Sequence, residues 1–469
     1  MFRNYHEGKL PAPATAPPRQ GLLLTVACLC QLMVLLDVSV VNLALPSIRS
    51  DLGFHAAGLQ WVINAYTLAF GGLLLLGGRI SDLFGLRRSA LLGLGLFALT
   101  SLLGGLAQSP GELIAARTLQ GVAGALLLPV SLTLITVTFP EGPDRHRALT
   151  IWSAVGSVGA AVGLLLGGFL TQELDWRWVL FINVPIAAVA FLLAARTVAA
   201  RPPGPRPRMD VPGAALVTLG LFSLIYAVVG TDRHSWGSPE TLVPLGLAVV
   251  LLTGFALFEQ RVATAPLVRF GLLRSRPVLA ANVVMFFVSS AQLGAFYLAS
   301  LYLQGSFGYS ALETGAAFVP FALGTIAGAT LAGRLVPRHG PRPTLVGGLA
   351  LSATGIAWLG GLSPDGTFLS EVLGPSILTS VGLGLCFVAL ASAATTGVAR
   401  EEAGLASGLL NSSRQCGGSI GLAILVTIAN AAGDPTAGTE RAFLLAAALM
   451  AAGAAIAAAL FRPSRRAET

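Results

Sequence analysis

Apolar stretches long enough to cross a lipid bilayer recur from one end of this 469-residue chain to the other. A helix needs about 20 such residues to span the hydrocarbon core. The chain is 54% hydrophobic and only 11% charged, whereas a soluble domain carries about 25% charged residues. The sequence therefore predicts an all-α membrane protein, because backbone groups in lipid must bond within their own helix. The fourteen stretches that qualify are residues 21–46, 59–78, 90–107, 111–138, 148–171, 176–198, 212–230, 241–258, 278–302, 313–333, 344–362, 371–395, 405–429 and 441–461.

The basic residues test this count, since the cytoplasmic loops of a membrane protein carry an excess of Lys and Arg. With the amino terminus placed inside, 23 basic residues fall on the cytoplasmic side and 4 on the outer side. The bias never reverses along the chain, as it would after a missed span. We therefore expect both termini in the cytoplasm. The Arg-, Ala- and Gly-rich composition favours the cell membrane of a bacterium, and the net charge of +8 reflects topology, not a nucleic-acid partner.

An internal repeat indicates two similar halves. Residues 77–87 read GGRISDLFGLR and residues 332–342 read AGRLVPRHGPR, and four Gly and Arg positions match at a constant offset of 255. Both segments join a second span to a third if a new six-helix unit begins near residue 278. Two six-helix bundles then form a parallel repeat with two further helices inserted between them. The expected units are a tail (1–20), the first bundle (21–200), a linker with the inserted helices (201–277), the second bundle (278–461) and a tail (462–469).

One carboxylate, Asp37, lies in the middle of the first apolar stretch, in the segment LMVLLDVSVVNLALP. An acidic residue at that depth costs about 2.5–3.5 kcal/mol to insert. Asp37 lies about 13 Å from the outer end at Pro46, and Arg117 about 10 Å from the same side after Pro110. Opposite charges at similar depth predict an ion pair, which lowers the cost of burying each. The pair is either purely structural or a proton site, and few other membrane acids are available to bind a proton.

Several segments resemble the 14-span drug/proton antiporters of the major facilitator superfamily. They are residues 36–46 (LDVSVVNLALP), 59–85, 117–129 (RTLQGVAGALLLP), 176–185 (WRWVLFINVP), 302–320 and 404–424. The resemblance covers nearly the whole chain. It implies the major facilitator fold with 14 transmembrane helices, and the export of lipophilic, often cationic compounds in exchange for protons. It also implies that Asp37 and Arg117 take part in proton coupling.

The chain departs from the family pattern at two places. Leu164 stands where the fifth-span motif usually has Pro, which puts a kink there in doubt, and Leu83 and Leu86 stand where basic residues are frequent. The glycines of the fifth span remain at spacings of three or four residues, and this predicts that a helix of the other half packs closely against them. These glycines are Gly156, Gly159, Gly163 and Gly167, and Gly168 of the same motif follows the last of them.

The repeated loop of the first half contains an acidic residue, Asp82, among several arginines. The resemblance implies a cytoplasmic gate in which Asp82 holds the two halves in one state. A solvated turn with arginines that set the topology is the alternative. The second copy has Pro337 at the equivalent position, so only the first half can make the acidic contact. The gate residues are Gly78, Arg79, Asp82, Gly85, Arg87 and Arg88, with the two glycines permitting tight turns.

Candidate substrate contacts combine aromatic rings with a few polar groups, as pockets for lipophilic ligands do. Tyr66 and Phe70 share a face of the second span. Gln292 and Phe296 share a face of the ninth span, with Tyr297 beside them. Each of these side chains is either a ligand contact or part of the core.

A second basic residue inside a span, Arg414, lies near the middle of the thirteenth stretch with Asn411 and Gln415 beside it. No acid in the neighbouring sequence is an evident partner. Three roles remain open: binding to helix-end carbonyls, binding to water, and binding to an anionic group of the substrate.

Other function classes lack the residues that they need. The four cysteines lie in apolar runs and the five histidines in loops or tails, so we expect no metal centre and no cofactor. No GxxxxGK[ST] motif for ATP occurs, and no nucleophile clusters with a base, which disfavours an enzyme. The expected partners are a small lipophilic substrate, protons and lipids, with the chain as a monomer. An uptake symporter, which Leu164 slightly favours, and a lipid translocator with a more apolar cavity remain alternatives.

Overall fold

The structure is a computed structural model, and almost all the residues that it describes are helical. They are residues 17–140, 142–199, 210–231, 234–263, 266–267, 270–361, 367–396, 398, 403–432 and 434–461. No β-strand occurs in these ranges. The all-helical architecture predicted from the apolar stretches is therefore confirmed for the described part of the chain.

The helices fall into three consecutive sets. The first set is α1 (Pro17–Leu52), α2 (Ala56–Leu59), α3 (Trp61–Phe84), α4 (Leu86–Gly105), α5 (Pro110–Thr138), α6 (Pro143–Glu173), α7 (Trp178–Phe181) and α8 (Asn183–Thr197). The second set is α9 (Val211–Gly230), α10 (Pro239–Arg261) and α11 (Phe270–Leu273). The third set is α12 (Arg276–Gly305), α13 (Ala311–Ala317), α14 (Val319–His339), α15 (Pro341–Leu359), the π-helical turn η1 (Phe368–Val372), α16 (Leu373–Thr395), α17 (Ala403–Ala431) and α18 (Pro435–Leu460).

Local sequence fixes where the important helices begin. The Ser109 hydroxyl caps α5 by accepting a hydrogen bond from the Glu112 N–H at 3.4 Å. Pro110 occupies the first helical position, where a missing N–H costs nothing. Asp434 caps α18 in the same manner, again followed by Pro. The cap on α5 sets the register of Arg117, which lies two turns further along the helix.

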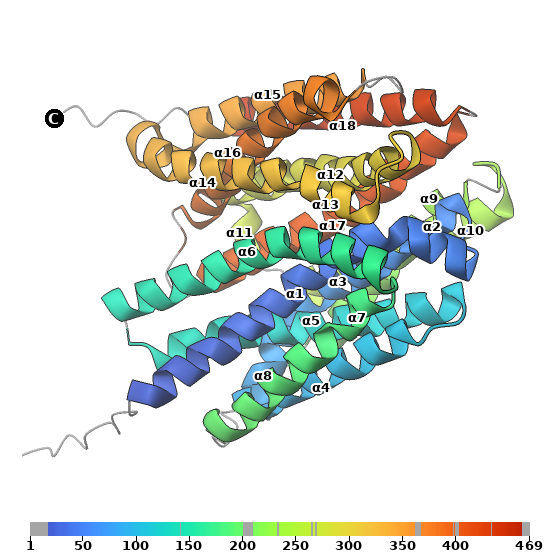
Figure 1. The fold of residues 1–469 in the computed structure, drawn as a ribbon. Helices are drawn as coiled ribbons and strands as arrows, with labels where there is room; N and C mark the ends of the chain where they lie inside the picture. Colours follow the sequence, from blue (N-terminus) through green and yellow to red (C-terminus); the bar gives the residue numbers. More distant parts are fainter. Residues whose placement is uncertain are drawn as a thin grey trace, which may run out of the picture.

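The first and third sets form two helical bundles that pack side by side (Figure 1). In the first, which we call the N bundle (α1–α8), α1 contacts α5, α6 and α8. In the second, the C bundle (α12–α18), α12 contacts α17 and α18, and α16 contacts α14 and α15. Figure 1 shows the blue-to-green helices of the N bundle below and most of the yellow-to-red C bundle above.

The internal repeat produces equivalent turns in the two bundles. Gly85 between α3 and α4 and Gly340 between α14 and α15 both have a φ of 82°. Glycine adopts this conformation without a steric penalty. The sequence analysis placed Asp82 in a loop, and this was wrong. Helix α3 continues to Phe84, so Asp82 lies in its last turn and the chain turns only at Gly85.

Ten segments of the described chain are long and apolar enough to cross a membrane. They comprise α1, α4, α5, α7 with α8, α9, α10, α12, α13 with α14, α16 and α18. Helices α3, α6, α15 and α17 are also long, with 24, 31, 19 and 29 residues, and they pack among the others. The predicted count of fourteen spans requires these four as well, and it stays a prediction.

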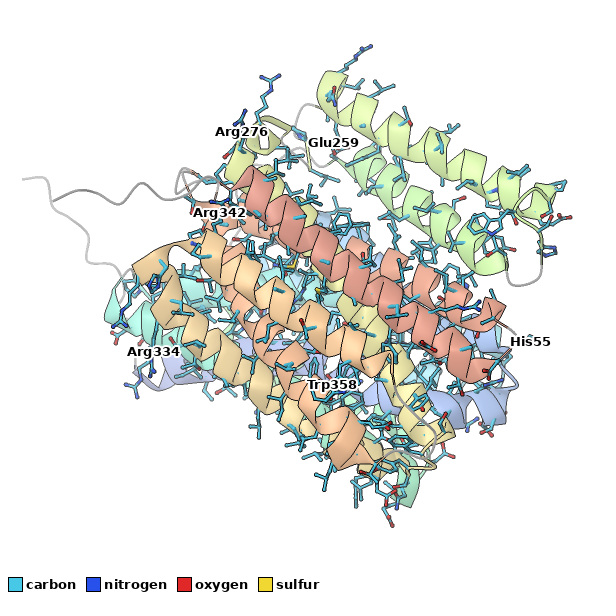
Figure 2. All side chains as sticks on the ribbon, turned by 90° about the horizontal axis from the view of Figure 1, so that it is seen from above. His55, Glu259, Arg276, Arg334, Arg342 and Trp358 are labelled. Atoms are coloured by element: carbon cyan, nitrogen blue, oxygen red, sulfur yellow. The ribbon has the colours of Figure 1, made fainter. Side chains whose placement is uncertain are left out.

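Labelled side chains distinguish the two ends of the bundles. Figure 2 shows Arg276, Arg334 and Arg342 at one end and His55, which follows α1, at the other. We call the end at which α1 finishes the Leu52 face and the opposite end the Gln20 face. The sequence analysis assigned these three arginines to the same side of the membrane, and their common location agrees with that assignment.

The inserted helices α9 and α10 pack against each other at the edge of the bundles, where Figure 2 shows them in pale green. Helix α9 also contacts α3 of the N bundle and α17 of the C bundle. The Trp61 and Phe222 rings stack with centroids 5.9 Å apart, and the Thr427 hydroxyl donates to the Val228 carbonyl at 3.4 Å. The inserted pair therefore covers one seam between the two bundles.

Direct contacts between the bundles occur from mid-depth toward the Leu52 face. The hydroxyl groups of Thr67 in α3 and Ser419 in α17 lie 2.6 Å apart. The Gln304 amide donates to the Leu43 carbonyl at 3.3 Å, which joins α12 to α1. A Cβ placed on Gly315 of α13 would lie only 2.5 Å from the Leu164 carbonyl oxygen of α6. Small side chains thus let the two bundles close on each other at this level.

Candidate functional site

The Asp37 carboxylate is completely buried inside the N bundle and accepts three hydrogen bonds. Arg117 Nη1 lies 2.5 Å from Asp37 Oδ2. Gln120 Nε2 and Asn183 Nδ2 donate to Asp37 Oδ1 at 2.8 and 2.9 Å. Asp37, Arg117, Gln120 and Asn183 are all at most 1% exposed. The ion pair predicted from matching depth is therefore confirmed, and two further donors complete the shell of the carboxylate.

The Arg117 guanidinium makes three hydrogen bonds. Its Nε donates to the Val62 carbonyl at 3.0 Å, and its Nη1 also donates to Gln120 Oε1 at 2.7 Å. The guanidinium carbon lies 4.4 Å from the centroid of the Tyr66 ring, within the range of a cation–π contact. A buried ion pair is tolerated only when its remaining donors and acceptors are also paired. Groups from α1, α3, α5 and α8 meet most of that requirement, while the Asn183 carbonyl oxygen and the Tyr66 hydroxyl have no hydrogen-bond partner among the described residues.

A clasp at the Leu52 face positions the helix that carries Asn183. Arg177 Nη1 lies 2.6 Å from Asp51 Oδ2, and Trp176 Nε1 donates to the same oxygen at 2.9 Å. The Arg177 guanidinium also lies over the Trp176 ring at 4.5 Å. Since Asp51 is near the end of α1, the clasp fixes α7 and α8 against α1. The WRW segment, identified above only as a family resemblance, thereby acquires a structural role.

The chemistry of the pair differs between an ionised and a protonated Asp37. An ionised Asp37 bound to Arg117 is a neutral, self-contained pair that needs no water. A protonated Asp37 would release Arg117 from its counter-ion, and a buried guanidinium without a partner is strongly unfavourable. Protonation of Asp37 must therefore be accompanied by a change in the position or solvation of Arg117. Such a coupling between charge and geometry is what a proton-driven conformational change needs.

The predicted gate residues lie close to the Gln20 face. Gly78 is inside α3, with Pro129 of α5 the nearest side chain to a Cβ placed there, and Arg88 is exposed. Arg87 Nη2 donates to the Ala195 carbonyl of α8, at 2.7 Å, within its own bundle. The side chains of Arg79 and Asp82 lie outside the described part of the structure. The contact between Asp82 and the other half therefore stays a prediction.

The fifth-span glycines pack mainly within their own bundle, which corrects the expectation that a helix of the other half lies against them. A Cβ on Gly159 would lie 2.6 Å from Leu32 Cδ1 of α1, and a Cβ on Gly167 would lie 2.8 Å from the Val40 carbonyl oxygen. Gly156 and Gly163 likewise face α1. Gly168 differs, because its Cβ would lie 2.5 Å from the Ala311 carbonyl oxygen of α13. One glycine of the series thus meets the other bundle.

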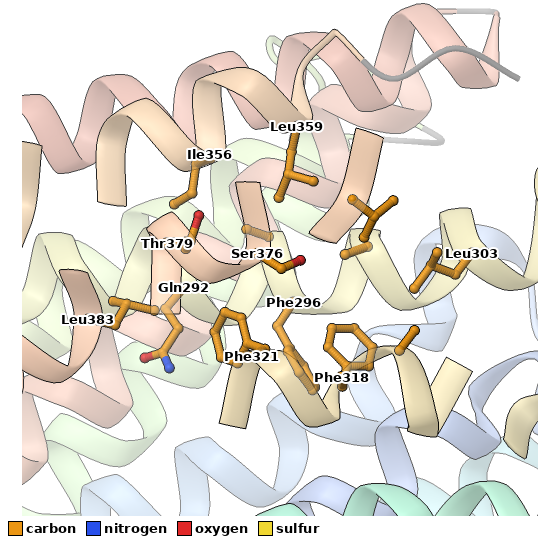
Figure 3. A pocket seen from close by; sticks show the side chains of 14 residues that line it. Gln292, Phe296, Leu303, Phe318, Phe321, Ile356, Leu359, Ser376, Thr379 and Leu383 are labelled. Atoms are coloured by element: carbon orange, nitrogen blue, oxygen red, sulfur yellow. The ribbon is translucent and has the colours of Figure 1, made fainter. Parts of the chain in front are cut away.

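The predicted substrate residues of α12 divide into two groups. Gln292 and Phe296 line a pocket inside the C bundle, between α12, α14, α15 and α16. Figure 3 shows Phe296, Phe318 and Phe321 gathered on one side of it and the Ser376 and Thr379 hydroxyl groups on the other. The Phe296 and Phe318 ring centroids are 4.4 Å apart. Tyr297, by contrast, is 1% exposed and does not line this pocket.

The other predicted substrate residues lie elsewhere. The Tyr66 and Phe70 rings stack at 5.8 Å within the N bundle, and Tyr66 supports Arg117. These two rings therefore belong to the surroundings of the ion pair. Asn411 Nδ2 donates to the Ser407 carbonyl of its own helix at 3.2 Å. Arg414 is half-buried in α17.

Two members of the Asp37 network, Gln120 and Asn183, were missed by the sequence analysis. Gln120 lies three residues after Arg117, so both side chains fall on one face of α5, and this spacing could have revealed it. Asn183 lies in the segment WRWVLFINVP, far in the sequence from its partner Asp37, and no local pattern indicates that contact. Ser101 completes the network, since Gln120 Nε2 donates to its hydroxyl at 2.9 Å.

Two helical bundles built on one repeat, with a buried charge pair in one and an apolar pocket in the other, define a polytopic helical membrane protein of the transporter class. Comparison with known proteins identifies the family. The sequence profile of the Major Facilitator Superfamily matches in two overlapping ranges, residues 27–422 and 283–469. The chain belongs to the major facilitator superfamily.

Curated relatives cover most of the chain. The cephamycin export protein CmcT of Amycolatopsis lactamdurans is 46% identical over 411 residues, which is 86% of this chain and 84% of that protein. The puromycin resistance protein pur8 of Streptomyces alboniger is 44% identical over 418 residues, covering 88% of this chain and 83% of that protein. The lincomycin resistance protein of Streptomyces lincolnensis is 35% identical, covering 85% and 82%.

Solved structures share the fold at low sequence identity. A bacterial homologue of the human lysosomal transporter Spinster, in an inward-facing and unoccupied conformation, superposes with a TM-score of 0.65 at 16% identity, covering 94% of this chain and 97% of that one. A POT family transporter in complex with a thioalcohol-conjugated peptide gives a TM-score of 0.70 at 15% identity, covering 94% and 95%. These likenesses confirm the major facilitator fold that the sequence analysis expected.

Proposed function

We propose that this chain exports lipophilic antibiotics or related secondary metabolites in exchange for protons. The observation that carries the proposal is the completely buried Asp37–Arg117 pair inside the N bundle of a major facilitator fold. Relatives with 44–46% identity are named for the export of cephamycin and for resistance to puromycin, and these names support an exporter of small molecules. Proton coupling is the part of the proposal that depends on Asp37.

The geometry of the network supports the proposed coupling. Asp37 in the ionised state holds α1, α5 and α8 together through Arg117, Gln120 and Asn183. A proton on Asp37 removes the charge that Arg117 needs and loosens this connection. Helix α1 also contacts α6 of its own bundle and α12 of the other, so a shift of α1 reaches the seam between the bundles. Proton binding and the alternation of access are coupled through this helix.

The proposal includes a membrane topology and a domain arrangement. The chain spans a bacterial cell membrane fourteen times, with both termini in the cytoplasm, so the Leu52 face lies outside and the Gln20 face lies inside. Two six-helix bundles, residues 21–200 and 278–461, rock about the substrate as a monomer, and residues 201–277 supply the linker and the inserted helices. Asp82 in the last turn of α3 forms the cytoplasmic gate with the arginines beside it.

Efflux in a pump-deficient bacterial host tests the export function. Cells that express the chain should survive higher concentrations of lipophilic antibiotics than cells that carry an empty vector. Inverted membrane vesicles should accumulate the same compounds only while a pH gradient is present, and ATP depletion at a fixed gradient should have no effect. Accumulation by intact cells would instead show an importer, and accumulation that follows ATP would exclude secondary transport.

A further inference from the structure

Arg414 is a cation near the middle of the long helix α17, and no described residue neutralises it. It lies 11 residues after the start of α17 and 17 before its end, and its side chain is half-buried. Within the described residues, no hydrogen bond or ion pair engages its guanidinium. An arginine at this depth is costly unless it pairs with an anion or faces a water-filled cavity. Arg117, the other arginine inside a span, differs because it pairs with Asp37 and with two further acceptors.

The neighbours of Arg414 on α17 show which way this helix faces. Gln415 packs against Gly71 of α3, and Ser413 donates to Asn282 Oδ1 of α12 at 2.8 Å. One turn further along, a Cβ on Gly418 would lie 3.1 Å from Leu293 of α12. Helix α17 is thus wedged between the N bundle and α12. Its middle belongs to the region in which a substrate would meet both bundles.

The acidic residues of the described helices cannot serve as partners for a positively charged substrate. Asp37 is the one carboxylate of these helices that lies more than six residues from a helix end. Its two oxygens are occupied by three donors, and it is completely buried in the N bundle. A cationic substrate at mid-depth would therefore meet Arg414 and no free negative charge. An anionic substrate would meet a free guanidinium, which binds carboxylate and sulfonate groups through paired hydrogen bonds.

Helix α12, which packs against α17, also lines an apolar pocket. Arg414 is four residues, about 6 Å along the helix axis, from Gly418, which contacts Leu293, the neighbour of Gln292. Gln292 lines the pocket that holds Phe296, Phe318 and Phe321 (Figure 3). The Thr379 hydroxyl, on the pocket wall, is buried without a hydrogen-bond partner among the described residues. Helix α12 thus joins the helix that carries Arg414 to a pocket with aromatic surface and an unused hydroxyl.

We propose that Arg414 binds an anionic group of the substrate, so that the preferred substrates are lipophilic monoanions such as carboxylates and sulfonates. The inference rests on the proposed export function and adds the substrate class to it. The acidic group of the substrate lies against Arg414 in the middle of α17. The family resemblance implied lipophilic cations, and the charges of this chain point to the opposite sign.

Two fluorescent probes that share one ring system and differ only in a negatively charged group show the effect of substrate charge on transport. 8-Anilinonaphthalene-1-sulfonate is a lipophilic monoanion, and N-phenyl-1-naphthylamine is the same scaffold without the sulfonate. Ethidium serves as a lipophilic cation. Transport of each probe is measured in proteoliposomes under an imposed pH gradient, for the wild-type chain and for Arg414→Gln and Arg414→Lys. Arg441→Gln, the same change on an exposed arginine of α18, is the matched control.

The wild type should transport the sulfonate faster than ethidium. Arg414→Gln should lower sulfonate transport about 10- to 100-fold, the effect of losing a charge-assisted hydrogen-bond pair. Transport of the neutral amine should change little in the same variant. Arg414→Lys should restore most of the sulfonate transport, because it restores the charge, and Arg441→Gln should behave as the wild type for all three probes. Size-exclusion profiles establish that each variant is folded before its rate is compared.

The outcomes separate the inference from the function on which it rests. Equal loss of the sulfonate and the neutral amine in folded Arg414→Gln would show a structural role and overturn the inference. Ethidium transport without sulfonate transport would overturn it as well and leave an exporter of cations. A wild type that moves none of the three probes, in a host test that also shows no antibiotic resistance, would remove the proposed function itself. If Arg414→Gln does not fold, a folded Arg414→Lys with unchanged selectivity supports the role of charge, and one that prefers ethidium contradicts it.

Discussion

Arg87 and Arg342 occupy equivalent positions in the two bundles and make the same contact. Each lies two residues after the turning glycine, and each donates a hydrogen bond of 2.7 Å from Nη2 to a backbone carbonyl of the last helix of its own bundle. For Arg87 the acceptor is Ala195 of α8, and for Arg342 it is Ala458 of α18. The internal repeat is thus preserved at the level of single hydrogen bonds, where it closes each bundle on itself.

This pairing predicts equal costs for two distant substitutions. Arg87→Ala and Arg342→Ala each remove a charged donor from a helix-end carbonyl, and each should lower the free energy of unfolding by about 1–3 kcal/mol. Thermal unfolding in detergent measures the change. Arg88→Ala, next to Arg87 but exposed, should change stability by less than about 0.5 kcal/mol. A large effect in one bundle and none in the other would show that the two contacts are not equivalent.

Two adjacent glycines predict two different defects. Gly167 faces the backbone of α1 in the same bundle, while Gly168 faces α13 of the other bundle. Gly167→Ala should therefore destabilise the fold by about 1–3 kcal/mol, since backbone atoms cannot yield to the new methyl group. Gly168→Ala should leave the N bundle intact and disfavour closure of the two bundles at the Leu52 face.

Distance distributions between spin labels on α6 and α13 distinguish the two glycine variants. Gly168→Ala should shift the population toward the longer distance, and Gly167→Ala should lower the melting temperature with little such shift. Gly111→Ala, at a site with open space around it, is the control for both measurements. Identical behaviour of Gly167→Ala and Gly168→Ala would contradict the assignment of their contacts.

Asn183 should contribute to the stability of the fold although it carries no charge. Its amide donates to Asp37 Oδ1 at 2.9 Å, and both residues are 0% exposed. Asn183→Ala leaves a buried carboxylate oxygen with one donor fewer, which costs about 1–3 kcal/mol of stability. Thr354→Ala removes an exposed hydroxyl from a backbone carbonyl of its own helix and is the matched control. Equal melting temperatures for the two variants would show that Asn183 does not support Asp37.

The sign of the substrate charge determines which gradient drives export. A monoanion that leaves as one proton enters moves two positive charges inward per cycle. The membrane potential then contributes about 2.3 kcal/mol per charge per 100 mV, in addition to about 1.4 kcal/mol per pH unit for the proton. An inside-negative potential set by potassium and valinomycin, without a pH difference, should therefore drive export of the sulfonate probe. Export that ignores the potential would indicate an electroneutral exchange, as expected for a monovalent cation.

The sequence was sufficient for the all-helical major facilitator fold and for the central pair. Apolar length, charge bias and the repeat predicted the helices and the two bundles, because the bilayer imposes these patterns on any chain that crosses it. Matching depth predicted the contact between Asp37 and Arg117. Depth is a simple function of position along a straight helix, so it can be read without knowing how the helices rotate.

The contacts that depend on the rotation of each helix about its axis could not be predicted from the sequence. The glycines of α6 were assigned to the other bundle, whereas most of them face α1. Tyr66 was a candidate substrate contact, whereas its ring supports Arg117. Asn183 was missed because its partner is 146 residues away in the sequence. Which face of a helix meets which neighbour is set by the packing of the whole bundle, and local patterns do not contain that information.

The measurement that tests the central claim most directly is transport driven by a pH jump in proteoliposomes that contain Asp37→Asn. This change keeps the shape and hydrogen bonding of the side chain and removes its titration, but it leaves Arg117 unpaired, at a cost of about 3–5 kcal/mol. The double variant Asp37→Asn/Arg117→Gln, which removes both charges, is therefore measured beside it, with melting temperatures for both. The account predicts that the double variant folds, exchanges substrate down a concentration gradient, and shows no transport driven by the pH jump. Full pH-driven transport by the folded double variant would contradict the account and show that the pair is structural.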